Sequence, residues 1–120
     1  MKLKGKTALV TGGATGIGLA IAKCLANEGC RVAIAGRREQ KLADAAAAHK
    51  RKPPLLYRRA NVAHRPSVGH LFRWADEQLG NIDILVNAAG MNIKDRTMAE
   101  MTPEQWDQVM SVNATGAYNC

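Results

Sequence analysis

The chain has 120 residues, of which 47% are hydrophobic and 22% charged, which excludes a disordered chain of low hydrophobicity and allows one domain at most. Its formal net charge of +7 raises the question of a nucleic-acid partner, but the few aromatic residues do not interleave with the basic ones and no recognition-helix or RNA-stacking motif occurs, so none is expected. No apolar run approaches the roughly 20 residues of a membrane span, and Met1–Lys4 lacks the apolar core of a signal peptide, so we expect a cytoplasmic protein without a membrane partner.

The most informative stretch of the chain runs from Thr7 to Gly18. An apolar run typical of a strand breaks into a glycine-rich turn, and an amphipathic helical pattern follows. The apolar face expected for that helix consists of Ile17, Ile21, Cys24 and Leu25. Strand, glycine turn and helix in this order predict the first half of a dinucleotide-binding βαβ unit, because residues without a Cβ let backbone N–H groups approach a pyrophosphate. The alternative is an ordinary strand-to-helix turn at Gly12 and Gly13, with Gly18 serving close packing.

Further along the chain, short apolar runs alternate with helical patterns. The expected elements are a strand over Val32–Ala35, a helix over Glu39–Ala48, a loop over Lys50–Pro54, a strand from Leu55 toward Asn61, a helix from Pro66 to Gly80, a strand over Ile82–Val86, a polar loop over Met91–Met101 and a last helix capped by Thr102. This alternation predicts one α/β domain over residues 1–120, a Rossmann-type doubly wound parallel sheet in three α/β/α layers. The last helical pattern still runs at Cys120, so the fold is expected to be truncated after the helix that follows the fourth strand.

The ends of the predicted strands carry the candidate site, since ligands of such sheets bind beyond the carboxyl ends of the strands. Small, amide or basic residues stand at four of these ends. They are the glycine turn, Gly36–Arg38, Asn61–Val62 and Asn87–Gly90. The cysteines (Cys24, Cys30, Cys120) and the histidines have no metal-ligand spacing, and no metal site is expected.

These motifs resemble those of the short-chain dehydrogenase/reductase family, and 3-oxoacyl-[acyl-carrier-protein] reductase-like members in particular. Residues Thr11–Gly18 fit the TGxxxGxG signature, Asn87–Gly90 resembles the NNAG-type motif, and Val112-Asn113 is similar to the family's helix asparagine. The resemblance covers the whole chain but only the amino-terminal half of a usual member. It implies an oxidoreductase that uses a nicotinamide dinucleotide and acts on a small carbonyl or alcohol substrate.

The resemblance also implies roles for individual residues. The cofactor-binding residues are expected to be Gly12, Gly13, Ala14, Thr15, Gly16, Ile17, Gly18, Arg37, Arg38, Asn61, Val62, Asn87, Ala88 and Gly90. Asn61 stands where the family commonly has an aspartate that touches the adenine amino group, and an amide oxygen can still accept that hydrogen bond. Val62 would lie against the adenine ring, and the Asn87–Gly90 segment beneath the cofactor ribose.

The charge of the residues that follow the second predicted strand distinguishes NADP(H) from NAD(H) as the expected cofactor. An acidic residue about twenty residues past the glycines normally binds the ribose 2′-hydroxyl of NAD. That position is Gly36 here, followed by Arg37 and Arg38. Because a guanidinium can pair with a 2′-phosphate, the sequence favours NADP(H). The alternative is that both arginines face solvent and Glu39 binds the ribose.

Asn113 is the one candidate catalytic residue. It shares a predicted helix face with Trp106, Val109, Met110 and Ala117, so we expect its amide to be buried and paired. The resemblance implies that it binds a water of the proton relay. The family's Tyr-x-x-x-Lys pair and its serine have no counterpart in residues 1–120.

Three interpretations remain open at this stage. The first is the amino-terminal portion of an NADP-dependent short-chain dehydrogenase or reductase, inactive and weakly folded by itself. In that case a homo-oligomer is expected only for the full-length form. The second is a non-catalytic nucleotide-binding or regulatory module with the same fold. The third, which the missing recognition motifs disfavour, is a nucleic-acid binder that uses the basic stretch between Arg31 and Arg59.

Overall fold

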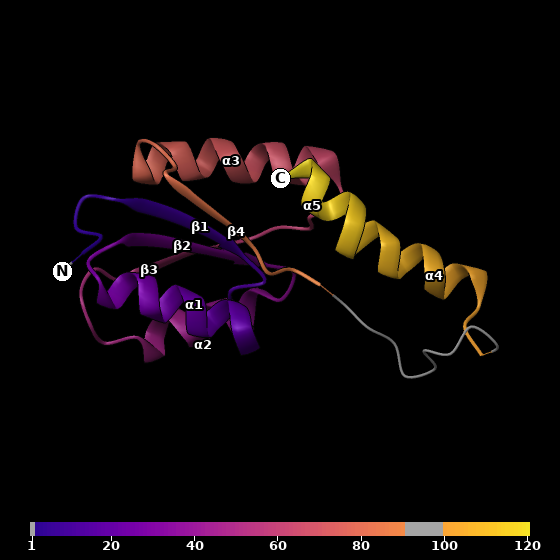
Figure 1. Ribbon diagram of the computed structural model, residues 1–120, viewed down its shortest axis with the longest axis horizontal. Coiled ribbons are helices and arrows are strands. Elements are labelled where there is room, and N and C mark those ends of the chain that lie inside the picture. The colour runs from indigo at the N-terminus through magenta and orange to yellow at the C-terminus, as the bar shows by residue number, and fades with distance from the viewer. Residues whose placement is uncertain (1, 91–99) are drawn as a thin grey trace.

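The computed structural model describes residues 2–90 and 100–120. Strands and helices alternate along it, as the sequence predicts (Figure 1). The elements are β1 (Thr7–Thr11), α1 (Gly16–Asn27), β2 (Arg31–Gly36), α2 (Glu39–Ala48), β3 (Leu55–Arg59), α3 (Arg65–Leu79), β4 (Ile84–Asn87), α4 (Pro103–Met110), the π-helix η1 (Ser111–Thr115) and α5 (Gly116–Asn119). The predicted loop over Met91–Met101 lies outside the described residues except for its last two.

The four strands form one parallel sheet in the order β3-β2-β1-β4. Helices α1 and α2 cover one face of this sheet and α3 covers the other, so the predicted three-layer doubly wound fold is confirmed (Figure 1). The strand order steps outward from β1 in both directions, which is where a doubly wound sheet opens a crevice for ligands. None of the helices in the described ranges combines the length and hydropathy that a membrane crossing demands.

The core consists of two apolar layers, one on each face of the sheet. Alternate residues of β1 point to opposite layers: Ala8 and Val10 pack toward α1 and α2, whereas Leu9 packs toward α3. All of β1 is buried, which agrees with a strand between two covered neighbours. At the start of β2, the guanidinium of Arg31 donates hydrogen bonds to the carbonyl oxygens of Gln78 (2.6 Å) and Leu79 (3.4 Å) and so connects β2 to the end of α3.

The packed face of α1 agrees with the prediction only in part. Its buried residues are Gly18, Ala22 and Ala26, while Ile17 is 78% exposed and Cys24 is exposed as well. The prediction chose the large apolar residues of the helix. Of the predicted face, Leu25 is partly buried and packs against the core. The buried positions are the small residues, which let the helix backbone approach the sheet closely.

The last predicted helix is interrupted. Its start is confirmed, because the backbone N–H of Gln105 donates to the Thr102 hydroxyl (3.1 Å) and the Gln105 side chain accepts from the Thr102 N–H (2.9 Å). After α4 the backbone widens into η1, whose extra residue per turn rotates the following side chains relative to an ideal α-helix. The buried residues then become Val112 and Gly116, and the predicted face with Trp106 (48% exposed) is wrong.

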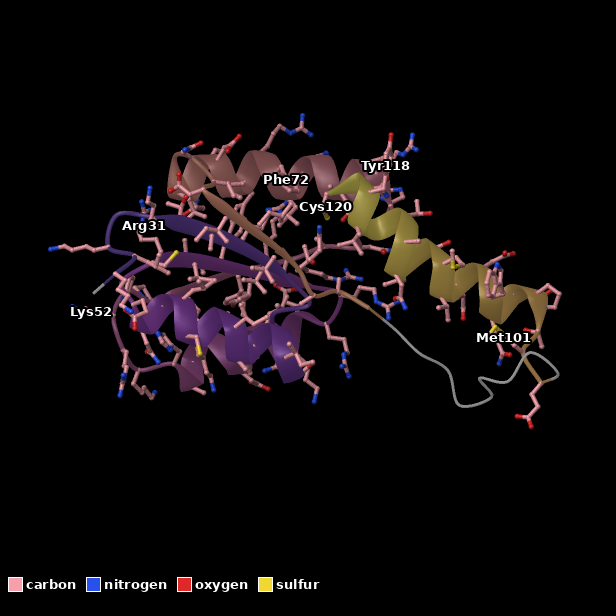
Figure 2. The ribbon with its side chains drawn as sticks, in the orientation of Figure 1. Arg31, Lys52, Phe72, Met101, Tyr118 and Cys120 are labelled. Carbon is pink, nitrogen blue, oxygen red and sulfur yellow. The ribbon has the colours of Figure 1, made fainter. Side chains whose placement is uncertain are left out.

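The end of the chain returns to α3, whereas α4 projects away from the sheet (Figure 1). Phe72 and Cys120 pack against a third apolar cluster of Val62, Val68 and Val112 (Figure 2). This cluster joins the loop after β3 to η1 and thereby brings η1 to the carboxyl end of the sheet.

Candidate functional site

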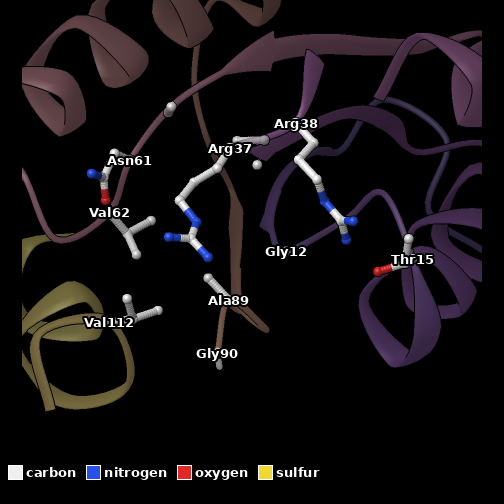
Figure 3. Close-up of a pocket in the computed structure, with 12 residues that line it drawn as sticks. Gly12, Thr15, Arg37, Arg38, Asn61, Val62, Ala89, Gly90 and Val112 are labelled. Carbon is white, nitrogen blue, oxygen red and sulfur yellow. The ribbon is translucent and has the colours of Figure 1, made fainter. Parts of the chain in front are cut away.

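A pocket of about 140 Å³ lies at the carboxyl ends of all four strands (Figure 3). Its lining residues are Gly12, Thr15, Ala35, Gly36, Arg37, Arg38, Ala60, Asn61, Val62, Ala89, Gly90 and Val112. Pockets that bury a whole drug-sized ligand measure about 300–1,000 Å³. This pocket therefore has room for part of a dinucleotide, and the remainder would lie along the open edge of the sheet.

The glycine turn packs tightly against the end of β4. Gly12 has a φ of +66°, and a Cβ there would lie 2.6 Å from the carbonyl oxygen of Ala88 and 2.7 Å from the Cα of Ala89. A Cβ on Gly18 would collide with the carbonyl oxygen of Gly12. The turn thus needs residues without side chains at both positions, so that the β1–α1 loop and the β4 end can touch.

The other residues of the turn separate into two groups. A Cβ on Gly13 would lie 2.7 Å from the Cβ of Ile34, so Gly13 serves packing against β2. Thr15, Gly16 and Ile17 are exposed. Gly16 has a φ of +57°, and no atom from outside its own helical turn and its chain neighbours lies within 4 Å of the position of its absent Cβ. Of the seven residues predicted to bind the cofactor in this turn, Gly12 and Thr15 line the pocket; the rest do not.

Two arginines enter the pocket from the end of β2. Arg37 and Arg38 are exposed, and Figure 3 shows Arg37 extending toward Val62 and Ala89 while Arg38 extends on the side of Thr15. Glu39, the alternative ribose ligand, begins α2 and does not line the pocket. Among the described residues that line the pocket none is acidic, so its charged groups are both cationic.

Asn61 and Val62 form the wall after β3. The Asn61 side-chain oxygen accepts a hydrogen bond from the Ala63 N–H (3.0 Å), and the Asn61 N–H donates to the Ser67 hydroxyl (2.9 Å). These bonds hold the turn while leaving the amide oxygen a second lone pair for a ligand. Val62 is buried in the third apolar cluster and presents an apolar surface to the pocket.

The segment after β4 is held by Thr11, for which the sequence motifs predict no separate role. Its buried hydroxyl accepts from the Ala89 N–H (3.3 Å) and donates to the Val86 carbonyl (3.4 Å), and its carbonyl accepts from the Ala88 N–H (3.2 Å). The sequence signal that could have indicated this role is a hydroxyl side chain at the end of an otherwise apolar strand. Of the predicted residues in this segment Gly90 lines the pocket, with its neighbour Ala89, whereas Asn87 and Ala88 do not.

Asn113 lies beside Gly90, but it is exposed, so the prediction of a buried amide is wrong. A Cβ added to Gly90 would be 3.4 Å from the Asn113 side-chain oxygen. The π-turn of η1 produces this arrangement, because it turns Val112 inward and leaves Asn113 at the rim, where the β4 segment passes. Gly116 allows the close packing, since a Cβ there would lie 2.6 Å from a methyl group of Val62.

No group of three potential metal-ligating side chains occurs among residues 2–90 and 100–120. The histidines that the sequence analysis set aside stay apart from the pocket, and His64 is the N-cap residue of α3. The site is therefore a groove of backbone, small side chains and two arginines. Such a groove can bind an anionic, extended ligand with one flat apolar end.

Comparisons with known proteins agree on one family. The short chain dehydrogenase family model matches residues 6–120. Among curated proteins, the chain is 37% identical over 117 residues to a 3-oxoacyl-(acyl-carrier-protein) reductase of Staphylococcus epidermidis, covering 96% of this chain and 48% of that protein. It is 36% identical over 118 residues to a D-beta-hydroxybutyrate dehydrogenase of Cupriavidus necator, covering 98% of this chain and 45% of that protein.

A solved structure supports the same likeness. A short chain dehydrogenase from Bacillus anthracis superposes with a TM-score of 0.92 at 30% identity, covering 98% of this chain and 47% of that one. The chain thus spans about half the length of the curated relatives and solved structures that it matches.

Proposed function

Because this chain belongs to the short-chain dehydrogenase family, we propose that it binds NADP(H) as part of an oxidoreductase acting on a carbonyl or alcohol substrate. The family implies a nicotinamide dinucleotide and a small-molecule substrate. The preference for the phosphorylated cofactor is the finer part of the proposal. The observation that carries it is the pair Arg37 and Arg38 in a pocket whose described lining contains no carboxylate.

The shape of the site fits a dinucleotide. The tight contact of Gly12 with Ala88 and of Gly18 with Gly12 leaves a bare backbone surface at the start of α1. A pyrophosphate would be held there by backbone N–H groups, at the positive end of the helix dipole. The exposed, side-chain-free position of Gly16 keeps this surface open.

The adenosine end would lie in the pocket itself. Val62 offers an apolar surface for the adenine ring, and the Asn61 amide oxygen keeps a lone pair for its amino group. The segment from Asn87 to Gly90 would pass beneath the nicotinamide side of the cofactor, where small side chains leave room. When bound, the cofactor supplies the hydride that is donated or accepted in the reaction.

The charge of the pocket favours a 2′-phosphate over a 2′-hydroxyl. A phosphate monoester carries about −1.5 to −2 charges at neutral pH, and a guanidinium can pair with it through two parallel hydrogen bonds. Both arginines are exposed, so solvent weakens each pair and the preference must come from the two acting together. A carboxylate in place of either would repel the same phosphate.

Asn113 is proposed to act at the substrate end. Its place beside Gly90 puts an amide at the rim of the groove, where it could hold a water or a substrate oxygen. The transfer of protons to the substrate would fall to a tyrosine and lysine, as the family resemblance implies, and residues 1–120 contain no Tyr-x-x-x-Lys. The second candidate is a nucleotide-binding module of the same fold without catalysis.

Calorimetry with NADP⁺ and NAD⁺ on the full-length protein tests the cofactor proposal. We expect NADP⁺ to bind at least about tenfold more tightly, as one or two charge-assisted hydrogen bonds would give. Arg37→Ala and Arg38→Ala should each reduce this ratio. Arg51→Ala is the matched control, because Arg51 is an exposed arginine in a different hollow beside Lys23 and His49.

Tighter binding of NAD⁺ would refute the cofactor preference, and no binding of either nucleotide would refute the proposed function. Oxidation of NADPH by the full-length protein with a panel of 3-oxoacyl thioesters, ketones and aldehydes then separates the two candidates. Binding without any turnover on such a panel favours the non-catalytic module.

A further inference from the structure

Arg59 contacts the backbone of Arg37 from the neighbouring strand. It is the last residue of β3 and lies opposite Gly36 in the parallel register. Its Nε donates a hydrogen bond to the carbonyl oxygen of Arg37 at 3.0 Å. The side chain of Arg59 thus extends the pairing of β2 and β3 one residue beyond the strand.

The carbonyl oxygens at the end of β2 differ in the kind of donor that binds them. Four successive carbonyl oxygens, from residue 35 to residue 38, each accept a hydrogen bond. Their donors, in order, are the Gly13 N–H (3.3 Å), the Ala60 N–H (2.8 Å), the Arg59 Nε and the Leu42 N–H (3.2 Å). Three donors are backbone groups whose positions the sheet and α2 determine. Only the carbonyl of Arg37 depends on a side chain, so the placement of its peptide is sensitive to substitution at Arg59.

Arg37 lies on the wall between two hollows. On one side is the pocket with Gly12, Arg38 and Val62; on the other is a hollow lined by Arg37, Arg59, Ala60, Asn61, His64 and Ser67. Arg59 lines the second hollow and not the first. Its side chain does not line the pocket and is connected to it through the backbone of Arg37.

We propose that Arg59 is a positioning residue for 2′-phosphate recognition: by holding the Arg37 carbonyl it directs the Arg37 guanidinium into the pocket. The inference rests on the proposed function. The hydrogen bond fixes the peptide from which the Arg37 side chain departs, so less conformational freedom is lost when the guanidinium pairs with a phosphate. It also occupies a carbonyl oxygen that would otherwise add negative partial charge near the phosphate.

The test uses two probes that differ only in the 2′-phosphate, 2′,5′-ADP and 5′-AMP, titrated calorimetrically into the full-length protein. Arg59→Gln removes the charge and the Nε donor. Arg59→Lys keeps the charge, but its ammonium group stands beyond the position of Nε. Arg58→Gln is the matched control: it removes the same charge one residue away, from a side chain that lines a hollow against α3 with His70 and Trp74.

We expect Arg59→Gln to weaken 2′,5′-ADP binding by about three- to tenfold and 5′-AMP binding by less than about twofold. The loss for 2′,5′-ADP corresponds to one charge-assisted hydrogen bond that acts indirectly, through the position of Arg37. Arg59→Lys should show most of this loss, and Arg58→Gln little of it.

Three results would overturn the inference. They are unchanged 2′,5′-ADP affinity in Arg59→Gln, equal losses in Arg59→Gln and Arg58→Gln, and full affinity in Arg59→Lys. If the unsubstituted protein binds both probes equally, the cofactor preference fails and this inference fails with it. If it binds neither, the proposed function itself is refuted. Because Arg59 is exposed, its variants should unfold at the denaturant concentration of the parent protein, which circular dichroism checks.

Discussion

Replacing Gly12 by alanine tests whether the glycine turn is shaped by its contact with the end of β4. Gly12 and Gly16 both have positive φ angles, +66° and +57°. An alanine in this region is strained by about 1–2 kcal/mol at either position. The two sites differ in their surroundings, and Gly16→Ala is therefore a matched control.

The difference comes from the space around each absent Cβ. At Gly12 the added carbon would lie 2.6 Å from the Ala88 carbonyl oxygen and 2.7 Å from the Ala89 Cα, both backbone atoms that cannot rotate away. At Gly16 no atom from outside its own helical turn and its chain neighbours lies within 4 Å of the added carbon. Overpacking of this kind costs about 1–3 kcal/mol. We therefore expect Gly16→Ala to lower the free energy of unfolding by about 1 kcal/mol and Gly12→Ala by about 3 kcal/mol.

Urea unfolding of the full-length protein, followed by circular dichroism, measures both losses from the shift of the midpoint. Equal losses in the two variants, within about 0.5 kcal/mol, would refute the reasoning, since they would mean that the contact with Ala88 contributes nothing. NADP⁺ affinity gives a second, independent readout for Gly16→Ala. Gly16→Ala would place a methyl group on the open surface proposed for the pyrophosphate, so its affinity should fall more than its stability does.

Two further predictions follow from buried groups. Thr11→Val should lower the free energy of unfolding by about 1–2 kcal/mol in the same urea assay, because the Ala89 N–H loses its acceptor while the side-chain volume is kept; an unchanged midpoint would contradict the role of the hydroxyl. Burial, and to a smaller extent the Asp83 carboxylate, raises the pKa of the Cys30 thiol above its ordinary value of 9.0. Below pH 9.0 the Cys30 thiol is protonated in both the folded and the unfolded protein. Above it the unfolded chain loses this proton first, so the free energy of unfolding should fall as the pH rises. In the Cys30→Ala variant this contribution to the decrease in unfolding free energy should be absent. The same pH dependence in the variant and in the unsubstituted protein would contradict the prediction.

Local signals in the sequence were sufficient for the order and type of most elements. The bounds of α2 agree with the prediction, and those of α3 and of the strands agree within a few residues. These features depend on short-range properties: the alternation or helical period of apolar residues, the proline and glycine positions, and the capping pair Thr102 and Gln105. Motifs at the strand ends predicted the family correctly, and the family implies a nicotinamide dinucleotide. The role of Arg37 and Arg38 in binding it stays a prediction.

The packing of α1 and of the last helix could not be read from the same signals. Periodicity favours large apolar residues for a buried face, yet α1 buries Gly18, Ala22 and Ala26 because its backbone lies close to the sheet. Nothing local to residues 111–115 predicts a π-turn. The contact of Gly116 with Val62 and the position of Asn113 beside Gly90 belong to that turn, and each joins segments far apart in the chain.

The assembly of the pocket was decided by tertiary structure as well. The strand order β3-β2-β1-β4 brings together Gly12, Arg37, Asn61 and Gly90, and the same order places Arg59 against the carbonyl of Arg37. Local backbone preferences determine which segments become strands and helices, since they act between near neighbours in the chain. Which face is buried, and which side chain holds which carbonyl, depends on contacts between distant segments, and those exist only once the layers have packed.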